Sequence, residues 1–102
     1  MNKDLFLKGL RMINYQLASG NGNVVKRLSS VAFRILQLHG DFLNEEIQVK
    51  LKEIQQFILD RTDLARAPIN QELTIHDLKK EQATTIVKQL LEIEFILEDK
   101  AS

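Results

Sequence analysis

The side chains that could do chemistry are few in this sequence and lie far apart along it. The only two histidines are His39 and His76, and cysteine is absent. Each histidine lies at the end of a predicted helix. In a bundle whose helices alternate in direction, these ends are at opposite poles, so the imidazoles are not expected to meet. Neither Glu-x-x-His nor His-Glu-x-x-His occurs, and we therefore predict no metal site and no cofactor.

Catalytic groups of other kinds are also not placed together by the sequence. Candidate hydroxyls are Ser29, Ser30, Thr84 and Thr85, and paired acids are Glu45/Glu46, Glu92/Glu94 and Glu98/Asp99. Nucleophilic catalysis needs a base and an orienting group beside the nucleophile, and no histidine lies near these hydroxyls in the chain. The acid pairs lie on strongly charged predicted helices, where a solvated face is the simplest interpretation. We predict that the chain is not an enzyme and has no small-molecule substrate.

A Gly-x-Gly stretch, Gly20 to Gly22, could suggest a phosphate-binding loop. It follows a predicted helix instead of a strand, and it lacks both the GxGxxG spacing and the Walker ending. We interpret it as a turn between two helices.

Composition predicts one helical domain. The 102 residues are 44% hydrophobic and 27% charged, which is ordinary for a folded protein, and they are enough for a single domain spanning 1–102. One proline and four glycines leave few sharp turns, which favours a few long elements. The beginning of the chain lacks the pattern of a signal peptide, and no apolar run could span a membrane. Together with the absence of cysteine, this predicts a cytoplasmic protein.

Apolar residues recurring every three or four positions predict four helices, at about 2–18, 24–38, 42–63 and 75–99. We expect an antiparallel four-helix bundle with a long C-terminal helix. Leu5 and Met12 lie off the main apolar stripe of the first helix and are expected to touch a second neighbour. The expected boundary residues are Asn23 and Asp41 as N-caps, Gly40 after the second helix, and Thr74 with Asp77 as a weak capping box.

The last helix carries apolar residues around most of its circumference from Ile86 to Leu97, with Leu91 at one edge and Phe95 nearly opposite the main stripe. Phe33 likewise points away from the stripe of the second helix. Either these rings belong to an interface, or neighbouring segments cover them. We predict self-association, with a homodimer favoured. The candidate interface residues are Phe33, Leu91, Phe95, Glu94, Glu98 and Asp99.

Charge is distributed unevenly although the formal net charge is zero. Residues 1–40 carry +5 and residues 41–102 carry −5. Attraction between the halves of one fold explains this most simply. Acids near the end of the last helix, where the helix dipole disfavours them, suggest a patch for a basic partner.

A nucleic-acid-binding regulator is the alternative function, with Arg11, Lys26, Arg27 and Arg34 as its candidate contacts. A helix-turn-helix around Gly40 is disfavoured because the helix after it begins with acids. The function that we expect is a non-enzymatic helical protein-interaction module. Small bundles of this kind serve as immunity proteins, secretion chaperones or accessory proteins, an analogy at the level of the fold.

Overall fold

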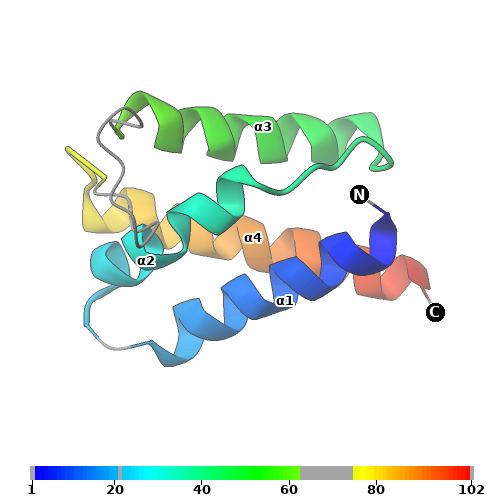
Figure 1. The fold of residues 1–102 in the computed structure, drawn as a ribbon, viewed down its shortest axis with the longest axis horizontal. Coiled ribbons are helices and arrows are strands. Elements are labelled where there is room, and N and C mark those ends of the chain that lie inside the picture. The colour runs from blue at the N-terminus through cyan, green and yellow to red at the C-terminus, as the bar shows by residue number, and fades with distance from the viewer. Residues whose placement is uncertain (1, 21, 63–74, 102) are drawn as a thin grey trace.

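The computed structural model describes residues 2–20, 22–62 and 75–101, with side chains as far as Glu98. Four helices pack together in this part of the chain: α1 (Lys3–Ser19), α2 (Val24–Leu36), α3 (Glu45–Asp60) and α4 (Lys80–Ala101) (Figure 1). They alternate in direction, and α1 begins at the end of the bundle where α4 ends (Figure 1). The predicted all-α four-helix bundle is confirmed. None of these described helices is long and apolar enough to cross a membrane.

Asparagine begins each of the first three helices. The Oδ1 atoms of Asn2, Asn23 and Asn44 each accept a hydrogen bond of 2.9 Å from the backbone N–H three residues ahead. This arrangement satisfies one of the amide groups that a helix leaves unpaired at its N-terminus. The predicted N-cap at Asn23 is confirmed, whereas the one at Asp41 is wrong, because Asn44 takes that position.

The connection between α2 and α3 is longer than predicted. α2 ends at Leu36, not at position 38, and α3 begins at Glu45, not at 42. Gln55 of α3 explains the early end of α2: its Nε2 donates to the carbonyls of Ile35 and Leu38, at 3.0 and 2.8 Å. These carbonyls thereby gain a donor from outside their own helix.

The connector between α2 and α3 is not helical, and two of its apolar side chains are buried. Leu38 and Leu43 are buried, whereas Phe42 stays 39% exposed although its ring meets that of Phe6 edge to face with centroids 5.4 Å apart. Gly40 passes so close to Leu43 that a Cβ atom there would lie 2.5 Å from its Cδ1. Gly40 is therefore needed for a close approach inside the connector, not directly after the last turn of α2 as the sequence suggested.

The long helix α4 begins at Lys80 instead of Ile75. Before it the chain turns at His76 and Asp77, and the backbone of Asp77 has a positive φ of 55°. The N–H of Lys79 donates to Oε1 of Gln82 at 3.0 Å, which is the return half of a capping box five residues later than predicted. The predicted cap Thr74 lies outside the described residues. With 22 residues α4 is still the longest of the described helices.

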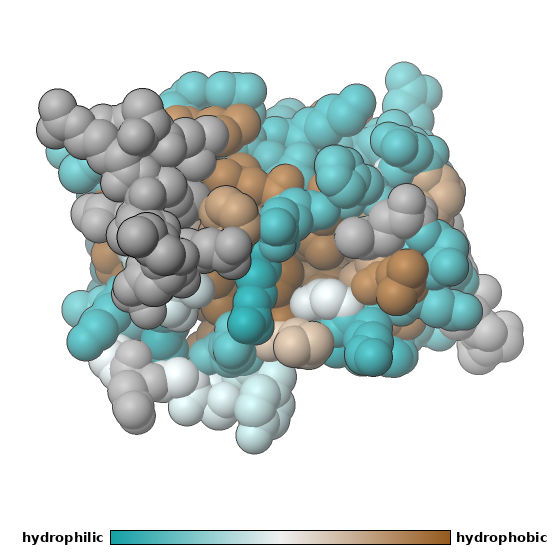
Figure 2. Space-filling model, viewed as in Figure 1, coloured by the Kyte–Doolittle hydropathy of each residue, from teal (hydrophilic) through white to brown (hydrophobic). Residues whose placement is uncertain are grey.

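The core lies where α1, α2 and α4 pack on one another, and α3 closes it by contacting α2 and α4. Its fully enclosed large side chains are Phe6, Leu10, Ile13, Leu28, Val31, Ile35, Ile58, Leu90 and Ile93. Figure 2 shows hydrophilic side chains over most of α3 and apolar side chains exposed between α3 and α1. Because α1 packs against α4, the candidate interface residues of α4 lie next to α1.

Candidate interaction face of α4

The side of α4 that points away from the core exposes two large apolar residues. Leu91 is 48% exposed and Phe95 is 71% exposed, although Leu90 and Ile93 beside them are buried. A helix places residues four apart on the same side, so Leu91 and Phe95 form one short apolar strip. We call this surface the α4 outer face and define it by Leu91, Glu92, Glu94, Phe95, Ile96 and Glu98, which together line a shallow hollow.

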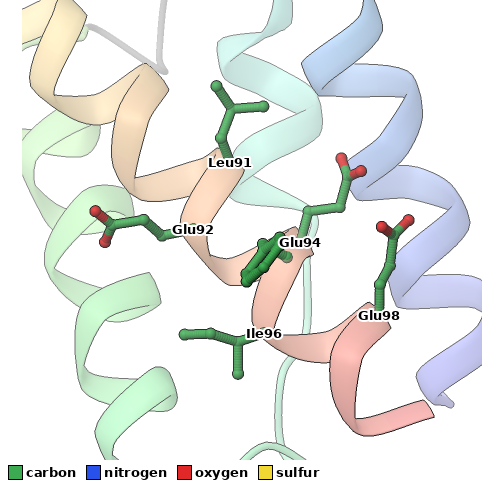
Figure 3. A pocket seen from close by; sticks show the side chains of 6 residues that line it. Leu91, Glu92, Glu94, Ile96 and Glu98 are labelled. Carbon is green, nitrogen blue, oxygen red and sulfur yellow. The ribbon is translucent and has the colours of Figure 1, made fainter. Parts of the chain in front are cut away.

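Side chains of the α4 outer face extend toward different neighbouring helices (Figure 3). Glu92 and Ile96 extend toward α3, whereas Glu94 and Glu98 extend toward α1. Phe95 lines the same hollow, whose volume is about 490 Å³. Three carboxylates therefore lie around one aromatic ring. Such a surface suits a partner that has an apolar centre with basic residues around it.

Two of these carboxylates are tied to α1. Nε of Arg11 donates to Oε1 of Glu98 at 2.8 Å, and Nδ2 of Asn14 donates to Oε1 of Glu94 at 2.8 Å. Nδ2 of Asn14 also lies 3.3 Å from the carbonyl oxygen of Leu90. These contacts fix how α1 and α4 are aligned along their lengths. Exposed ion pairs contribute little to stability. The Arg11–Glu98 pair therefore mainly influences how α1 and α4 are aligned and how charge is distributed on their surface.

The other apolar residues of this segment are covered. Leu97 is buried, and Val87 and Ile96 are half-buried and pack against the core. Phe33 of α2, the second aromatic residue of the predicted interface, is also half-buried against the core. A neighbouring segment therefore covers Phe33 in part, while Phe95 remains open. The side chain of Asp99 lies outside the described residues.

The four basic candidates differ in how they are engaged within the bundle. Arg11 is paired with Glu98, Nη1 of Arg27 donates to the carbonyl of Leu17 at 2.9 Å, and Nη1 of Arg34 donates to Oε1 of Gln16 at 3.0 Å. Only the side chain of Lys26 has no such contact among the described residues. Three of the four candidates thus help to hold α1 against α2 or α4.

The groups with catalytic potential are also separated. His39 and His76 are exposed on two different connecting segments. The hydroxyls of Ser30, Thr84 and Thr85 donate to backbone carbonyls of their own helices. In the described part of the chain, no three His, Asp or Glu side chains come close enough together to hold a metal ion.

A second exposed apolar surface, on α1, was not expected. Leu5, Met12 and Tyr15 are 57, 51 and 72% exposed, although Leu5 and Met12 were predicted to touch a second neighbour. The position of Leu5 and Met12 off the main apolar stripe indicated an outward face of α1. Tyr15 belongs to the same face. The reason is that α3, which could have covered α1, packs on the opposite side of the bundle (Figure 1).

Comparison of the chain with protein-family models, with curated proteins and with solved structures gives no match.

Proposed function

We propose that this chain is a non-enzymatic, self-associating protein-interaction module, and that the α4 outer face is its contact surface. The observation that carries the proposal is the 71% exposure of Phe95, which lines the hollow on α4. An exposed phenylalanine on a helix that is otherwise well packed gains free energy when a partner covers it. A cytoplasmic location belongs to the same proposal, supported by the absence of cysteine.

The surroundings of Phe95 support binding over chemistry. The hollow offers apolar carbon and carboxylates but no hydroxyl, imidazole or amine. Catalytic and small-molecule sites are usually deeper and combine apolar walls with several kinds of convergent polar group. An apolar centre with a charged border is instead the usual composition of a protein interface.

Sedimentation equilibrium of the purified chain tests the proposal. We expect a monomer–dimer equilibrium for the natural sequence and a monomer for Phe95→Glu, because the new carboxylate must be desolvated at the contact. Thr85→Glu is the matched control, since Thr85 is also exposed on α4 and gains the same charge. Circular dichroism confirms that both variants fold. A dimer that survives Phe95→Glu, or a natural chain that stays monomeric at high concentration, contradicts the proposal.

A further inference from the structure

The outer face of α1 complements that of α4. Exposed Met12 and Tyr15 lie on the side of α1 that points away from the core, and exposed Lys8 and Arg11 lie beside them. The face of α1 around Met12 and Tyr15 therefore carries two bases, whereas the hollow around Phe95 on α4 is lined by Glu92, Glu94 and Glu98. One base and one acid of this set, Arg11 and Glu98, already pair within the chain. Because α1 and α4 pack side by side, the two faces form one surface with a positive and a negative half.

From this complementarity, and resting on the self-association proposed above, we infer that a second copy of the chain covers both helices, with α1 of each copy lying on α4 of the other. A twofold axis running along the helices, between α1 and α4, produces this arrangement twice in one closed dimer. A twofold axis running across the helices would instead place α4 on α4 and bring carboxylates against carboxylates. Opposite potentials favour the first arrangement.

The internal contacts between α1 and α4 also fix the register of this dimer. Arg11 lies at the level of Glu98, and Asn14 at the level of Glu94 and Leu90. Rotation about an axis along the helices leaves these levels unchanged. Phe95 of one copy therefore meets the stretch of α1 that carries Met12 and Tyr15 of the second copy. The apolar residues of α4 in one copy and of α1 in the second copy thus lie at the same height along the helices.

The exposed area is suitable for such a contact. Taking about 200 Å² for a large side chain, the exposed fractions of Met12, Tyr15, Leu91 and Phe95 give roughly 500 Å² per copy. The largest apolar patch of a typical monomer is about 300–600 Å², and a standard interface covers about 800 Å² per partner. Covering both helices approaches that value, whereas the α4 outer face alone supplies only half of the apolar area.

Charge reversal on α1 distinguishes the two dimers. Lys8→Glu places a carboxylate opposite the acidic half of the second copy, so we expect the dimer Kd to rise about tenfold or more. Lys26→Glu is the matched control, because it makes the same charge change at an exposed position on α2. Equal dimer Kd values for the two variants overturn the inference, because the inferred contact places Lys8, and not Lys26, against the second copy.

Cross-linking tests the register directly, because the natural chain has no cysteine to interfere. Ser19 and Lys88 are exposed on the outer sides of α1 and α4 and lie at nearly the same level. We expect a short bismaleimide to join Ser19→Cys chains to Lys88→Cys chains when the two are mixed, and to join neither variant to itself. Cross-linking of Lys88→Cys alone, or no product from a mixture that sedimentation shows to be dimeric, overturns the inferred arrangement.

These outcomes separate the two proposals. A dimer that is lost on Phe95→Glu but shows no α1-to-α4 cross-link leaves the proposed function in place and overturns the inference. A natural chain that is monomeric by sedimentation overturns both.

Discussion

Asn14 of α1 and Glu94 of α4 are joined by a hydrogen bond of 2.8 Å between Nδ2 and Oε1, at a point where Asn14 is only 5% exposed. Oδ1 of the same amide is buried and has no partner in the described part of the chain. One half of this buried side chain is therefore satisfied and the other is not. The link aligns two helices at the cost of one desolvated oxygen.

Substitutions at Asn14 should separate these two effects. Asn14→Asp replaces the donor with a carboxylate that faces Glu94, and we expect the free energy of unfolding to fall by about 3 kcal/mol. Asn14→Leu removes the unpaired oxygen together with the donor, while the carbonyl of Leu90 keeps its bond inside α4, so we expect a change below about 1 kcal/mol. Urea denaturation measures both. Equal stabilities of the two variants would show that the contact with Glu94 has no influence.

The end of α2 depends on a side chain from α3. Gln55→Ala removes the donor to the carbonyls of Ile35 and Leu38, and we expect a loss of about 1–2 kcal/mol in the free energy of unfolding. Gln56→Ala is the control, because Gln56 is exposed and bonds only to Asp60, and its loss should stay below about 0.5 kcal/mol. A similar urea midpoint for both variants would contradict this role of Gln55.

Leu90 and Leu91 are adjacent but should respond to truncation in opposite ways. Leu90 is fully buried, so Leu90→Ala should cost about 2–5 kcal/mol of unfolding free energy by leaving a cavity. Leu91 is 48% exposed, so Leu91→Ala should cost less than about 1 kcal/mol and mainly raise the dimer Kd.

Thermal unfolding at several protein concentrations checks this pair, because only a change in association depends on concentration. A large, concentration-independent loss for Leu91→Ala would place Leu91 in the core of the monomer and weaken the case for the α4 outer face.

Much of the fold could be read from the sequence, because local rules decide it. The spacing of apolar residues identified all four helices. Apolar residues that recur at this spacing, such as Phe6, Leu10 and Ile13 of α1 and Leu90 and Ile93 of α4, are buried. Asn23 begins α2 as expected, since a cap depends on a side chain and an amide three residues apart. The sequence placed Phe95 opposite the stripe of its helix but left open whether a neighbouring segment covers it.

Tertiary contacts decided the rest. α2 ends early and α3 begins late because Gln55, Phe6 and Leu51 hold the connector between them from other parts of the chain. Phe33 and Phe95 have similar positions on their helices, yet only Phe33 is half-buried against the core. Periodicity states which side of a helix is apolar but not which neighbour covers the opposite side. That choice follows from the placement of α3 against α2 and α4, which leaves the outer faces of α1 and α4 uncovered.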